Sequence, residues 1–310
     1  MRSIHTGGEV LTGCGVTQQC GESLTLSCPA KLNVFLEIAG KRPDGYHELD
    51  TVMMRTSFCD QLTIRQSQSE LLTLRFSDAT PEALRKGVPL DDHNLILRAA
   101  EAVRKRVGQP FGAEFILHKR IPPESGLGGG SSNAASALLL CRQFWNAPIV
   151  DAELHDIAAS LGSDINFLLS GQRAAVCRGR GEIIDPIALN RRLYFVAVRP
   201  REGNSTAAVF RATTVSGAPE SSSGVVENLK GNAVGSLNSL IFNRLTDAAK
   251  LLNPEMALLM SRMQSTTRRP VFMSGSGSTV FLVANSYADA AAMLVQIRTR
   301  LHAVGWMLEC

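Results

Sequence analysis

The sequence lacks the spaced cysteine and histidine motifs that hold metal ions. Its 310 residues contain no Cys-x-x-Cys pair and no His-Glu-x-x-His, and its six histidines do not cluster. Seven cysteines are present, but their number is odd and their spacing is scattered. The missing motifs argue against a zinc site, and the odd number and scattered spacing of the cysteines argue against a disulfide framework. We expect reduced thiols, as in a cytoplasmic protein.

Long apolar runs and long blocks of like charge are also missing. No apolar stretch approaches the roughly 20 residues of a membrane span, and the first 26 residues hold no apolar core of a secretory signal. The formal net charge is only +4, from 32 basic and 28 acidic side chains. Neither a membrane nor a nucleic acid is therefore expected as a partner. We interpret residues 1–26 as a disordered extension, or as the product of a start codon placed too early.

The most informative feature that is present is a glycine-rich stretch. Residues 126–135 read Gly-Leu-Gly-Gly-Gly-Ser-Ser-Asn-Ala-Ala, and a run of helix-forming residues follows. A helix that begins in such a loop presents free N–H groups and partial positive charge, which together bind phosphate. No lysine follows the glycines as in a Walker loop, and no Gly-x-Gly-x-x-Gly opens an initial βαβ unit. The alternative is a flexible loop before an ordinary core helix.

Hydrophobic periodicity predicts a chain with both helices and strands. Strands are expected at residues 24–39, 51–58, 61–65, 71–76, 113–118, 174–178, 182–184, 193–199, 271–273 and 279–284. Helices are expected at 95–107, 152–161, 237–252, 255–263 and 287–304. One more helix is expected to begin directly after the glycine-rich stretch. Residues 213–236 are rich in Ser, Gly and Asn, which predicts a long loop or linker. A second domain is expected to begin near the strand at 193–199.

Five side chains stand out beside the predicted strands and turns. Lys31 and Asn33 are two residues apart on the first strand, so they point to the same side. Tyr46 and His47 follow a Pro-Asp-Gly turn, where an aromatic ring and an imidazole could clamp a planar base. Asp164 sits in a tight turn before an apolar segment. Plainer interpretations stay open, namely a surface lysine, a pair that closes a hairpin and a turn aspartate.

Three separated motifs together resemble a known family. Pro-Ala-Lys-Leu-Asn lies at residues 29–33, the glycine-rich stretch lies in the middle, and Ser-Gly-Ser-Gly-Ser lies at 274–278. From about residue 27 to the end, the chain resembles the GHMP kinases, which include galactokinase, homoserine kinase and mevalonate kinase. The resemblance implies an α+β, two-domain GHMP kinase fold. Its N-terminal domain (27–189) would be similar to ribosomal protein S5 domain 2. Its C-terminal domain (190–310) would be ferredoxin-like, with the active site between the two.

Within this family, the Arg-Pro-Asp-Gly-Tyr-His-Glu-Leu motif is similar to that of kinases whose acceptor is a cytidine-diphosphate-linked methylerythritol. The resemblance therefore implies phosphoryl transfer from ATP, with Mg²⁺, to the 2-hydroxyl of that acceptor in the non-mevalonate isoprenoid route. Both ligands are small molecules. The protein would act in the cytoplasm as a monomer or a weak homodimer.

The resemblance also implies roles for the residues that match the motifs. Asp164 would be the catalytic base, and Lys31 beside it would support its charge and steady the attacking oxygen. The cytosine would lie between the rings of Tyr46 and Phe210, with His47 bonding its edge. The substrate residues would be Asn33, Tyr46, His47, Thr206 and Phe210. The ATP residues would be Asn94, Lys119, Pro122, Gly126, Leu127, Gly128, Gly129, Gly130, Ser131, Ser132 and Asn133, with Ser132 also a Mg²⁺ ligand.

Two departures from the resemblance lie close to these residues. Ile-Asn follows Asp164 where such kinases more often have Val-Pro, and Glu-Ser replaces glycines directly before Gly126. Neither departure removes a proposed catalytic group. Two alternatives to the leading interpretation stay open: a GHMP kinase for homoserine or a mevalonate-type acceptor, and a non-catalytic GHMP-fold binding protein. The Tyr46–His47 pair argues against the first. Lys31 and Asp164 argue against the second, since a sensor has no need of a base.

Overall fold

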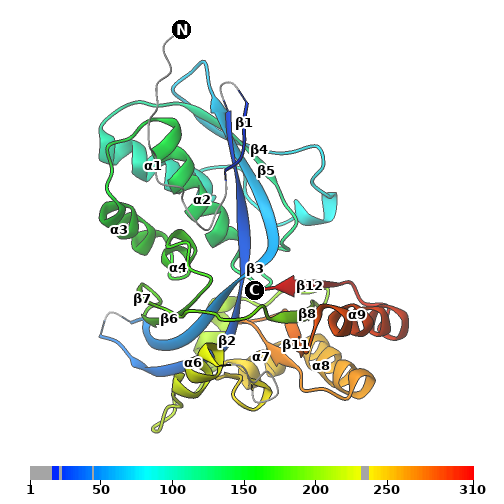
Figure 1. The fold of residues 1–310 in the computed structure, drawn as a ribbon. Helices are drawn as coiled ribbons and strands as arrows, with labels where there is room; N and C mark the ends of the chain where they lie inside the picture. Colours follow the sequence, from blue (N-terminus) through cyan, green and yellow to red (C-terminus); the bar gives the residue numbers. More distant parts are fainter. Residues whose placement is uncertain (1–15, 21–22, 44, 232–236) are drawn as a thin grey trace.

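Two long antiparallel strands connect the upper and lower parts of the molecule (Figure 1). They are β2 (Ser23–Lys41) and β3 (His47–Gln66), seen here in a computed structural model that describes residues 16–20, 23–43, 45–231 and 237–310. β3 keeps its pairing with β2 through Cys59 and Asp60. For this reason the two strands expected at 51–58 and 61–65 are one continuous strand.

The larger sheet is built outward from this pair. β3 pairs with β5 (Ala113–His118) along its second half and with β6 (Ala174–Gly179) along its first half. The outer strands are β1 (Val16–Cys20) beside β2, β4 (Leu72–Phe76) beside β5, β7 (Ile183–Pro186) beside β6, and β9 (Phe242–Asn243) beside β2. A short 3-10 helix, η1 (Glu82–Leu84), follows β4. The change of partner along β3 lets one strand serve both parts of the molecule.

Helices cover one face of the upper half of this sheet (Figure 1). They are α1 (Leu95–Val107), α2 (Gly129–Phe144), α3 (Asp151–Leu161) and α4 (Ile165–Leu169). α2 packs against α1, β2 and β3, and its first turns are rich in small residues, among them the buried Ala134 and Ala135. Small side chains let the helix approach the strands closely. The beginning of α2 is thereby held next to the residues of β2.

The smaller sheet forms the lower part. Its strand order is β10 (Phe272–Met273), β11 (Val280–Ala284), β8 (Tyr194–Val198) and β12 (Gly305–Glu309), all antiparallel. α9 (Tyr287–Leu301) packs on this sheet, with α8 (Pro254–Thr267) beside it. Leu32 and Val34 of β2 share a buried cluster with Phe195 and Phe281 of the smaller sheet. One core therefore continues across the junction of the two parts.

The stretch at 213–236, expected to be a loop, contains a helix. α6 (Ser223–Lys230) buries Val225 and Leu229, which lie one turn apart, while the helix leaves its polar residues outside. The high Ser and Gly content hid these two apolar positions. Residues 232–236 lie outside the described part of the chain.

The helix expected at 237–252 is wrong over its first half. A 3-10 turn, η2 (Leu237–Ser239), and β9 come first, and only then does α7 (Thr246–Leu252) begin. β9 forms because it pairs in parallel with β2, a contact that local pattern does not reveal. The short α5 (Thr206–Ala212) and the final strand β12 were also not predicted.

The expected disordered extension, residues 1–26, is partly regular structure. Val16–Cys20 form β1, which pairs antiparallel with Ser23–Leu26 at the beginning of β2. The expectation of disorder is wrong for these residues because the sheet edge supplies hydrogen-bond partners. Residues 1–15, 21 and 22 lie outside the described part of the chain.

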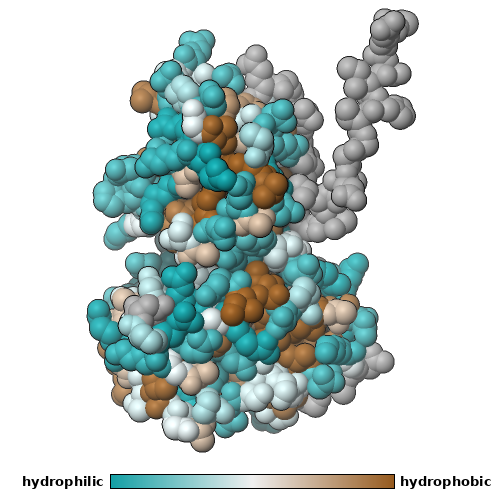
Figure 2. Space-filling view, turned by 90° about the vertical axis from the view of Figure 1, so that its left-hand side faces the viewer, coloured by the Kyte–Doolittle hydropathy of each residue, from teal (hydrophilic) through white to brown (hydrophobic). Residues whose placement is uncertain are grey.

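The side of the molecule seen in Figure 2 is mostly polar and narrows to a waist between the two parts. Apolar side chains gather both above and below this waist. Across the residues that the structure describes, no helix has both the length and the apolar character needed to cross a membrane.

Candidate active site

A pocket of about 410 Å³ lies between the two parts of the molecule. The beginning of α2 and the turn before α4 border it from above, and α5 and the loop after β10 border it from below. Side chains of β2 and β3 line it between these borders. Residues from the start, middle and end of the chain therefore meet in one place.

The two glycine-rich loops pack directly against each other. Gly126 has φ +74°, and a Cβ on it would lie 2.3 Å from the carbonyl oxygen of Ser274 and 2.8 Å from that of Gly277. The Ser274 hydroxyl donates to the Gly126 carbonyl (3.1 Å), and the Thr279 amide donates to the Ser125 carbonyl (3.0 Å). Only glycine allows this approach. The second loop therefore braces the first.

The N-terminus of α2 opens into the pocket. Gly128 precedes the helix at φ +68°, and no side chain of the described residues caps this end. A Cβ on Gly128 would meet the Lys31 side chain at 2.8 Å, whereas the nearest atom to a Cβ on Gly130 is Leu95 Cδ1 at 3.9 Å. The helix end is thus closed on the Lys31 side and open at Gly130. An uncapped, accessible helix N-terminus is well suited to bind phosphate.

A chain of polar side chains runs from this pocket into the larger sheet. Lys31 Nζ lies 3.2 Å from Asp164 Oδ2 and donates to Asn33 Oδ1 (2.5 Å). Asn33 Nδ2 donates to Thr51 Oγ1 (2.9 Å), which donates to the Phe35 carbonyl (2.6 Å). The Lys31 side chain is 5% exposed and that of Asp164 is 27% exposed. The ammonium is therefore held in place, while the carboxylate keeps access to the pocket.

An irregularity in β2 aims Lys31 at the pocket. The β2–β3 register shifts between Pro29 and Lys31, and the Lys31 amide donates to the Leu127 carbonyl of the glycine loop (2.9 Å). Such a bulge redirects a side chain and frees a backbone group for another partner. The prediction that Lys31 and Asn33 point to the same side is confirmed by their hydrogen bond.

The aromatic ring of Phe210 on α5 lines the pocket. The His47 ring packs against Phe210 with centroids 5.3 Å apart at 31°. Thr206 also lines the pocket, and its hydroxyl is 2.8 Å from that of Ser276. Tyr46 is 54% exposed and does not line the pocket; the ring that contacts Phe210 is that of His47. The sandwich of a base between Tyr46 and Phe210 stays a prediction.

Comparison with known proteins connects this geometry to a family. Residues 94–176 match the family described as "GHMP kinases N terminal domain", and residues 225–303 match "GHMP kinases C terminal". The chain belongs to the GHMP kinase family. The α+β, two-domain fold class predicted from the sequence is thereby confirmed.

Its relatives include proteins named 4-diphosphocytidyl-2-C-methyl-D-erythritol kinase. One from a Polaromonas species is 37% identical over 254 residues, covering 82% of this chain and 81% of the relative. Another, from Salinispora arenicola, is 37% identical over 271 residues, covering 84% of each chain. A crystal structure of 4-(cytidine 5'-diphospho)-2C-methyl-D-erythritol kinase is 31% identical with TM-score 0.70, covering 92% of this chain and 98% of that chain. Homoserine kinase from Cytophaga hutchinsonii has TM-score 0.69 at 16% identity, with 94% and 95% covered, a likeness that shows the fold alone.

The other residues expected on the ATP side of this GHMP kinase fall into two groups. Six of them line the pocket: Pro122, Gly126, Gly128, Gly129, Gly130 and Ser131. Leu127 is buried in the core and contributes its carbonyl to Lys31. Asn94 caps α1, accepting from the Ile96 amide (2.9 Å) and donating to the Pro89 carbonyl (2.6 Å). These two residues support the pocket from behind without lining it.

Lys119 and Asn133 meet at a buried carboxylate beneath α2. Lys119 Nζ lies 2.5 Å from Asp60 Oδ2, and Asn133 Nδ2 donates to the same oxygen (3.0 Å). Asp60 Oδ1 accepts from the amides of Arg120 and Ile121. The Lys119 side chain is 3% exposed and does not line the pocket. A Cβ on Gly129 would lie 2.9 Å from Lys119 Nζ, so the ammonium lies against the beginning of α2, and its expected role on the ATP side stays a prediction. Asp60 belongs to none of the sequence motifs, so the sequence did not indicate its role.

Ser132 is the one expected metal ligand. Its hydroxyl is buried in the first turn of α2 and has no hydrogen-bond partner among the described residues. A buried polar atom without a partner costs about 1–3 kcal/mol, so such atoms usually have a reason to be kept. The pocket is lined by the neighbouring Ser131 and not by Ser132, so the role of Ser132 as a metal ligand stays a prediction.

Cys177 lies behind the Lys31–Asp164 pair and was not singled out by the sequence. Burial, with a smaller contribution from the charge of Asp164, raises the pKa of the Cys177 thiol to about 12. β6 pairs it with Thr51 of β3. The thiol therefore stays protonated and packs as a small apolar side chain in the core.

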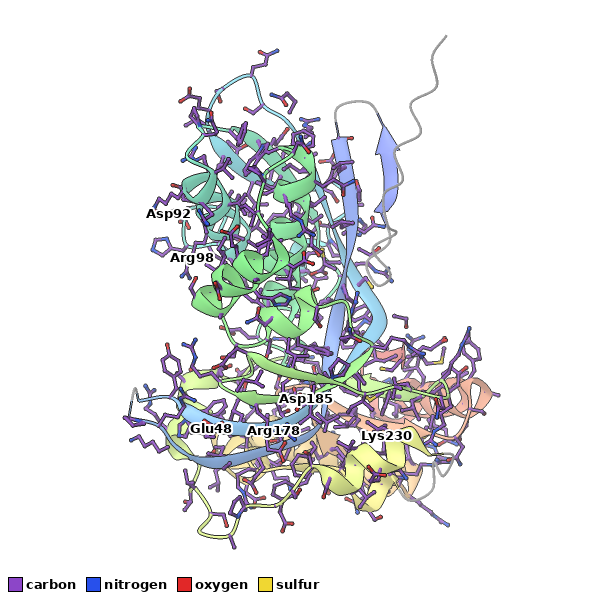
Figure 3. The ribbon with its side chains drawn as sticks, turned by 60° about the vertical axis from the view of Figure 1, so that its left-hand side comes forward. Glu48, Asp92, Arg98, Arg178, Asp185 and Lys230 are labelled. Atoms are coloured by element: carbon purple, nitrogen blue, oxygen red, sulfur yellow. The ribbon has the colours of Figure 1, made fainter. Side chains whose placement is uncertain are left out.

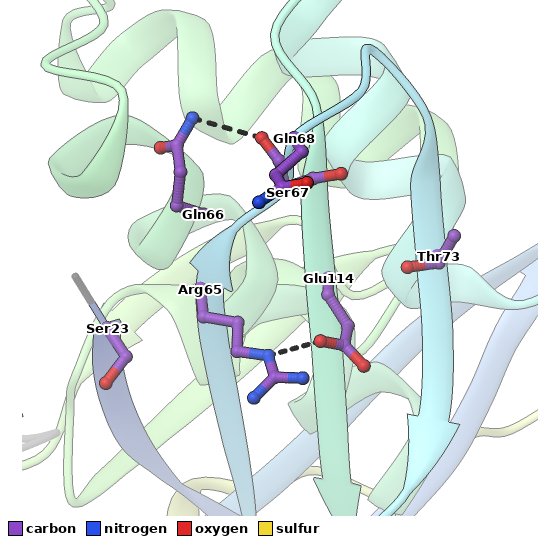
Figure 4. A pocket seen from close by; sticks show the side chains of 7 residues that line it. All are labelled: Ser23, Arg65, Gln66, Ser67, Gln68, Thr73 and Glu114. Atoms are coloured by element: carbon purple, nitrogen blue, oxygen red, sulfur yellow. Dashed lines mark hydrogen bonds and ion pairs between the residues drawn. The ribbon is translucent and has the colours of Figure 1, made fainter.

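A second hollow lies on the larger sheet, and its lining residues differ from those of the pocket at the junction. It has a volume of about 520 Å³ and is lined by Ser23, Arg65, Gln66, Ser67, Gln68, Thr73 and Glu114 (Figure 4). Arg65 and Glu114 pair with each other across β3 and β5, so their charges are already matched. None of the predicted site residues lines this hollow, whereas the pocket at the junction is lined by Lys31, Asn33 and Asp164 together, which makes it the active-site candidate.

Proposed function

We propose that this GHMP kinase transfers the γ-phosphate of ATP to the 2-hydroxyl of 4-diphosphocytidyl-2-C-methyl-D-erythritol. The observation that carries the proposal is the Lys31–Asp164 pair, which faces the open N-terminus of α2 across one pocket. The relatives named for this kinase, similar over most of their length, support the same acceptor. The pocket-lining ring of Phe210, against which His47 packs, suits its cytosine.

The chemistry follows from the placement of these groups. Phosphoryl transfer depends on alignment and charge stabilisation, with little covalent help from the protein. The N–H groups of α2 would hold the phosphates of ATP. Asp164 would accept the proton of the attacking hydroxyl as the new O–P bond forms, and ADP would leave with the electron pair of the broken bond. Lys31 would stabilise the negative charge that develops on the attacking oxygen.

Mg²⁺ is proposed to accompany ATP, where it would neutralise charge on the phosphates. The unpartnered hydroxyl of Ser132 supports its assignment as a contact for the ion, and Ser131 is the serine of the same turn that lines the pocket. Tyr46 and Phe210 are proposed to enclose the cytosine, which requires the base to enter beside His47. The half-exposed ring of Tyr46 and the pocket position of Phe210 support this assignment.

Cytoplasmic location, a monomeric or weakly dimeric state, and domain limits at 27–189 and 190–310 belong to the same proposal. The first residues of the smaller sheet, in β8, support a boundary shortly before Tyr194.

Turnover tests the proposal directly. Purified protein is incubated with ATP, Mg²⁺ and one acceptor at a time, and ADP release is followed. We expect ADP release with 4-diphosphocytidyl-2-C-methyl-D-erythritol and none above background with homoserine or mevalonate. An Asp164→Asn preparation, purified in the same way, controls for contaminating kinases. Release with homoserine or mevalonate alone would replace the proposed acceptor.

A further inference from the structure

An arginine on the β6–β7 turn lies over the ring of Tyr46. The guanidinium carbon of Arg180 is 5.0 Å from the ring centroid, a distance typical of a cation–π contact. Arg180 Nη2 donates to the Ala159 carbonyl (3.3 Å), and its amide donates to Glu182 Oε2 (2.6 Å). These contacts hold the side chain over Tyr46.

The same turn abuts the segment that carries the proposed base. Gly181 has φ +119°, and a Cβ on it would lie 3.0 Å from the carbonyl oxygen of Ser163. Ser163 lines the pocket and directly precedes Asp164. On the other side of Arg180, the Gly179 amide donates to Glu48 Oε1 (3.0 Å). The turn therefore contacts Tyr46 through the Arg180 guanidinium and the Ser163–Asp164 segment through the neighbouring Gly181.

We infer that Arg180 binds the diphosphate of the acceptor. The inference rests on the proposed function, in which cytosine lies by Tyr46 and the reacting hydroxyl by Asp164. In that acceptor the diphosphate joins the cytidine to the methylerythritol, so it has to pass between these two points. A guanidinium group there can bond two phosphate oxygens at once through its planar fork of N–H groups.

Nearby carboxylates leave Arg180 available for this contact. Glu182 Oε1 is 4.0 Å from Arg180 Nε, a loose ion pair, and Glu48 is engaged by Arg42 (2.8 Å). Arg178, two positions earlier on β6, instead pairs with Asp185 on β7, where both side chains are half exposed (Figure 3). The two arginines of this segment thus differ in their partners, which makes Arg178 a matched control.

Binding of cytidine diphosphate and of cytidine separates a phosphate contact from simple support of Tyr46. Both ligands are titrated calorimetrically into the wild-type protein and into Arg180→Met and Arg178→Met variants. We expect Arg180→Met to weaken cytidine diphosphate binding by about tenfold to a hundredfold, the usual worth of charge-assisted hydrogen bonds. Cytidine binding should stay unchanged, as should both affinities in Arg178→Met. Arg180→Lys should keep part of the affinity, because it keeps the charge but not the fork.

Three results would decide against the inference. Equal weakening of both ligands in Arg180→Met would mean that the arginine only supports the Tyr46 ring. Unchanged binding of both would mean that it has no part in the site. If the wild-type protein bound neither ligand and released no ADP with the proposed acceptor, the proposed function would fail first, and this inference with it. If the wild-type protein binds both ligands, a failure of this inference can be distinguished from a failure of the proposed function.

Discussion

Replacing Asp164 by asparagine tests the centre of the proposed mechanism. The amide has almost the same shape as the carboxylate, and its oxygen can still accept from Lys31, which keeps its other bond to Asn33. The base is lost, because an amide does not take up a proton. A positioned general base contributes about 10²–10⁴ in rate, or about 2.7–5.4 kcal/mol of transition-state stabilisation.

We therefore expect Asp164→Asn to lower kcat by about 10²–10⁴, with KM for ATP within about threefold of wild type. KM for ATP should hold because the phosphates are proposed to bind at the N-terminus of α2, which Asp164 does not contact. Stability should fall by less than the roughly 3–5 kcal/mol of a fully buried broken pair, since the Asp164 side chain is 27% exposed. Thermal unfolding verifies that the variant is folded.

Steady-state ADP release with varied 4-diphosphocytidyl-2-C-methyl-D-erythritol is the assay. Asp156→Asn is the matched control, because it makes the same change on an exposed part of α3, outside the pocket. Its kcat should equal that of wild type. A folded Asp164→Asn enzyme with near-normal kcat would refute the role of Asp164 as the base.

Three further predictions concern the supports of the site. Gly126→Ala should lower the unfolding free energy by at least about 1–2 kcal/mol, because alanine is strained at this positive φ and its Cβ would also collide with the second loop. Chemical denaturation should show no loss for Gly130→Ala, because its Cβ would make only an ordinary contact, 3.9 Å from Leu95 Cδ1, in a helix that favours alanine. Burial raises the pKa of Glu37, but the hydrogen bonds and charge of Arg244, with two backbone amides, outweigh it and hold the pKa below its ordinary value. Stability from this ion pair is thus present above about pH 4.3 and lost as the pH falls through the lower, folded-state pKa. Arg244→Met should cost about 3–5 kcal/mol at pH 7, and the deficit measured by denaturant titration should shrink at lower pH; a constant deficit would contradict this. Cys177, with its pKa raised to about 12, should resist iodoacetamide at pH 8 until the protein unfolds, as peptide mass spectrometry can show.

Local chemistry was enough to predict several parts of the fold. The helix at Leu95–Val107 and its left-handed stop at Gly108 follow from apolar spacing and from the conformational freedom of glycine. Alternation along β2 placed Lys31 and Asn33 on one side, and the run after the glycines marked the beginning of α2. These features depend on neighbours in sequence, which is why the sequence reveals them.

The expectations and the structure differ where the contacting residues are distant in the sequence. The buried ion pair of Lys119 with Asp60 of β3 was not expected. The packing of His47 against Phe210 was not expected either, because it depends on how α5 meets β3. α6 forms in a stretch rich in Ser and Gly, since the shared core gives Val225 and Leu229 somewhere to be buried.

The sequence by itself determined the family, because motifs are carried by consecutive residues. Only the tertiary structure decided that the loop at Gly126 is braced by the loop at Ser274, and that Lys31 reaches Asp164 at 3.2 Å. Both contacts join segments far apart in the chain. Their geometry depends on a bulge in β2 and on the packing of two sheets over one core, and a linear pattern does not specify either.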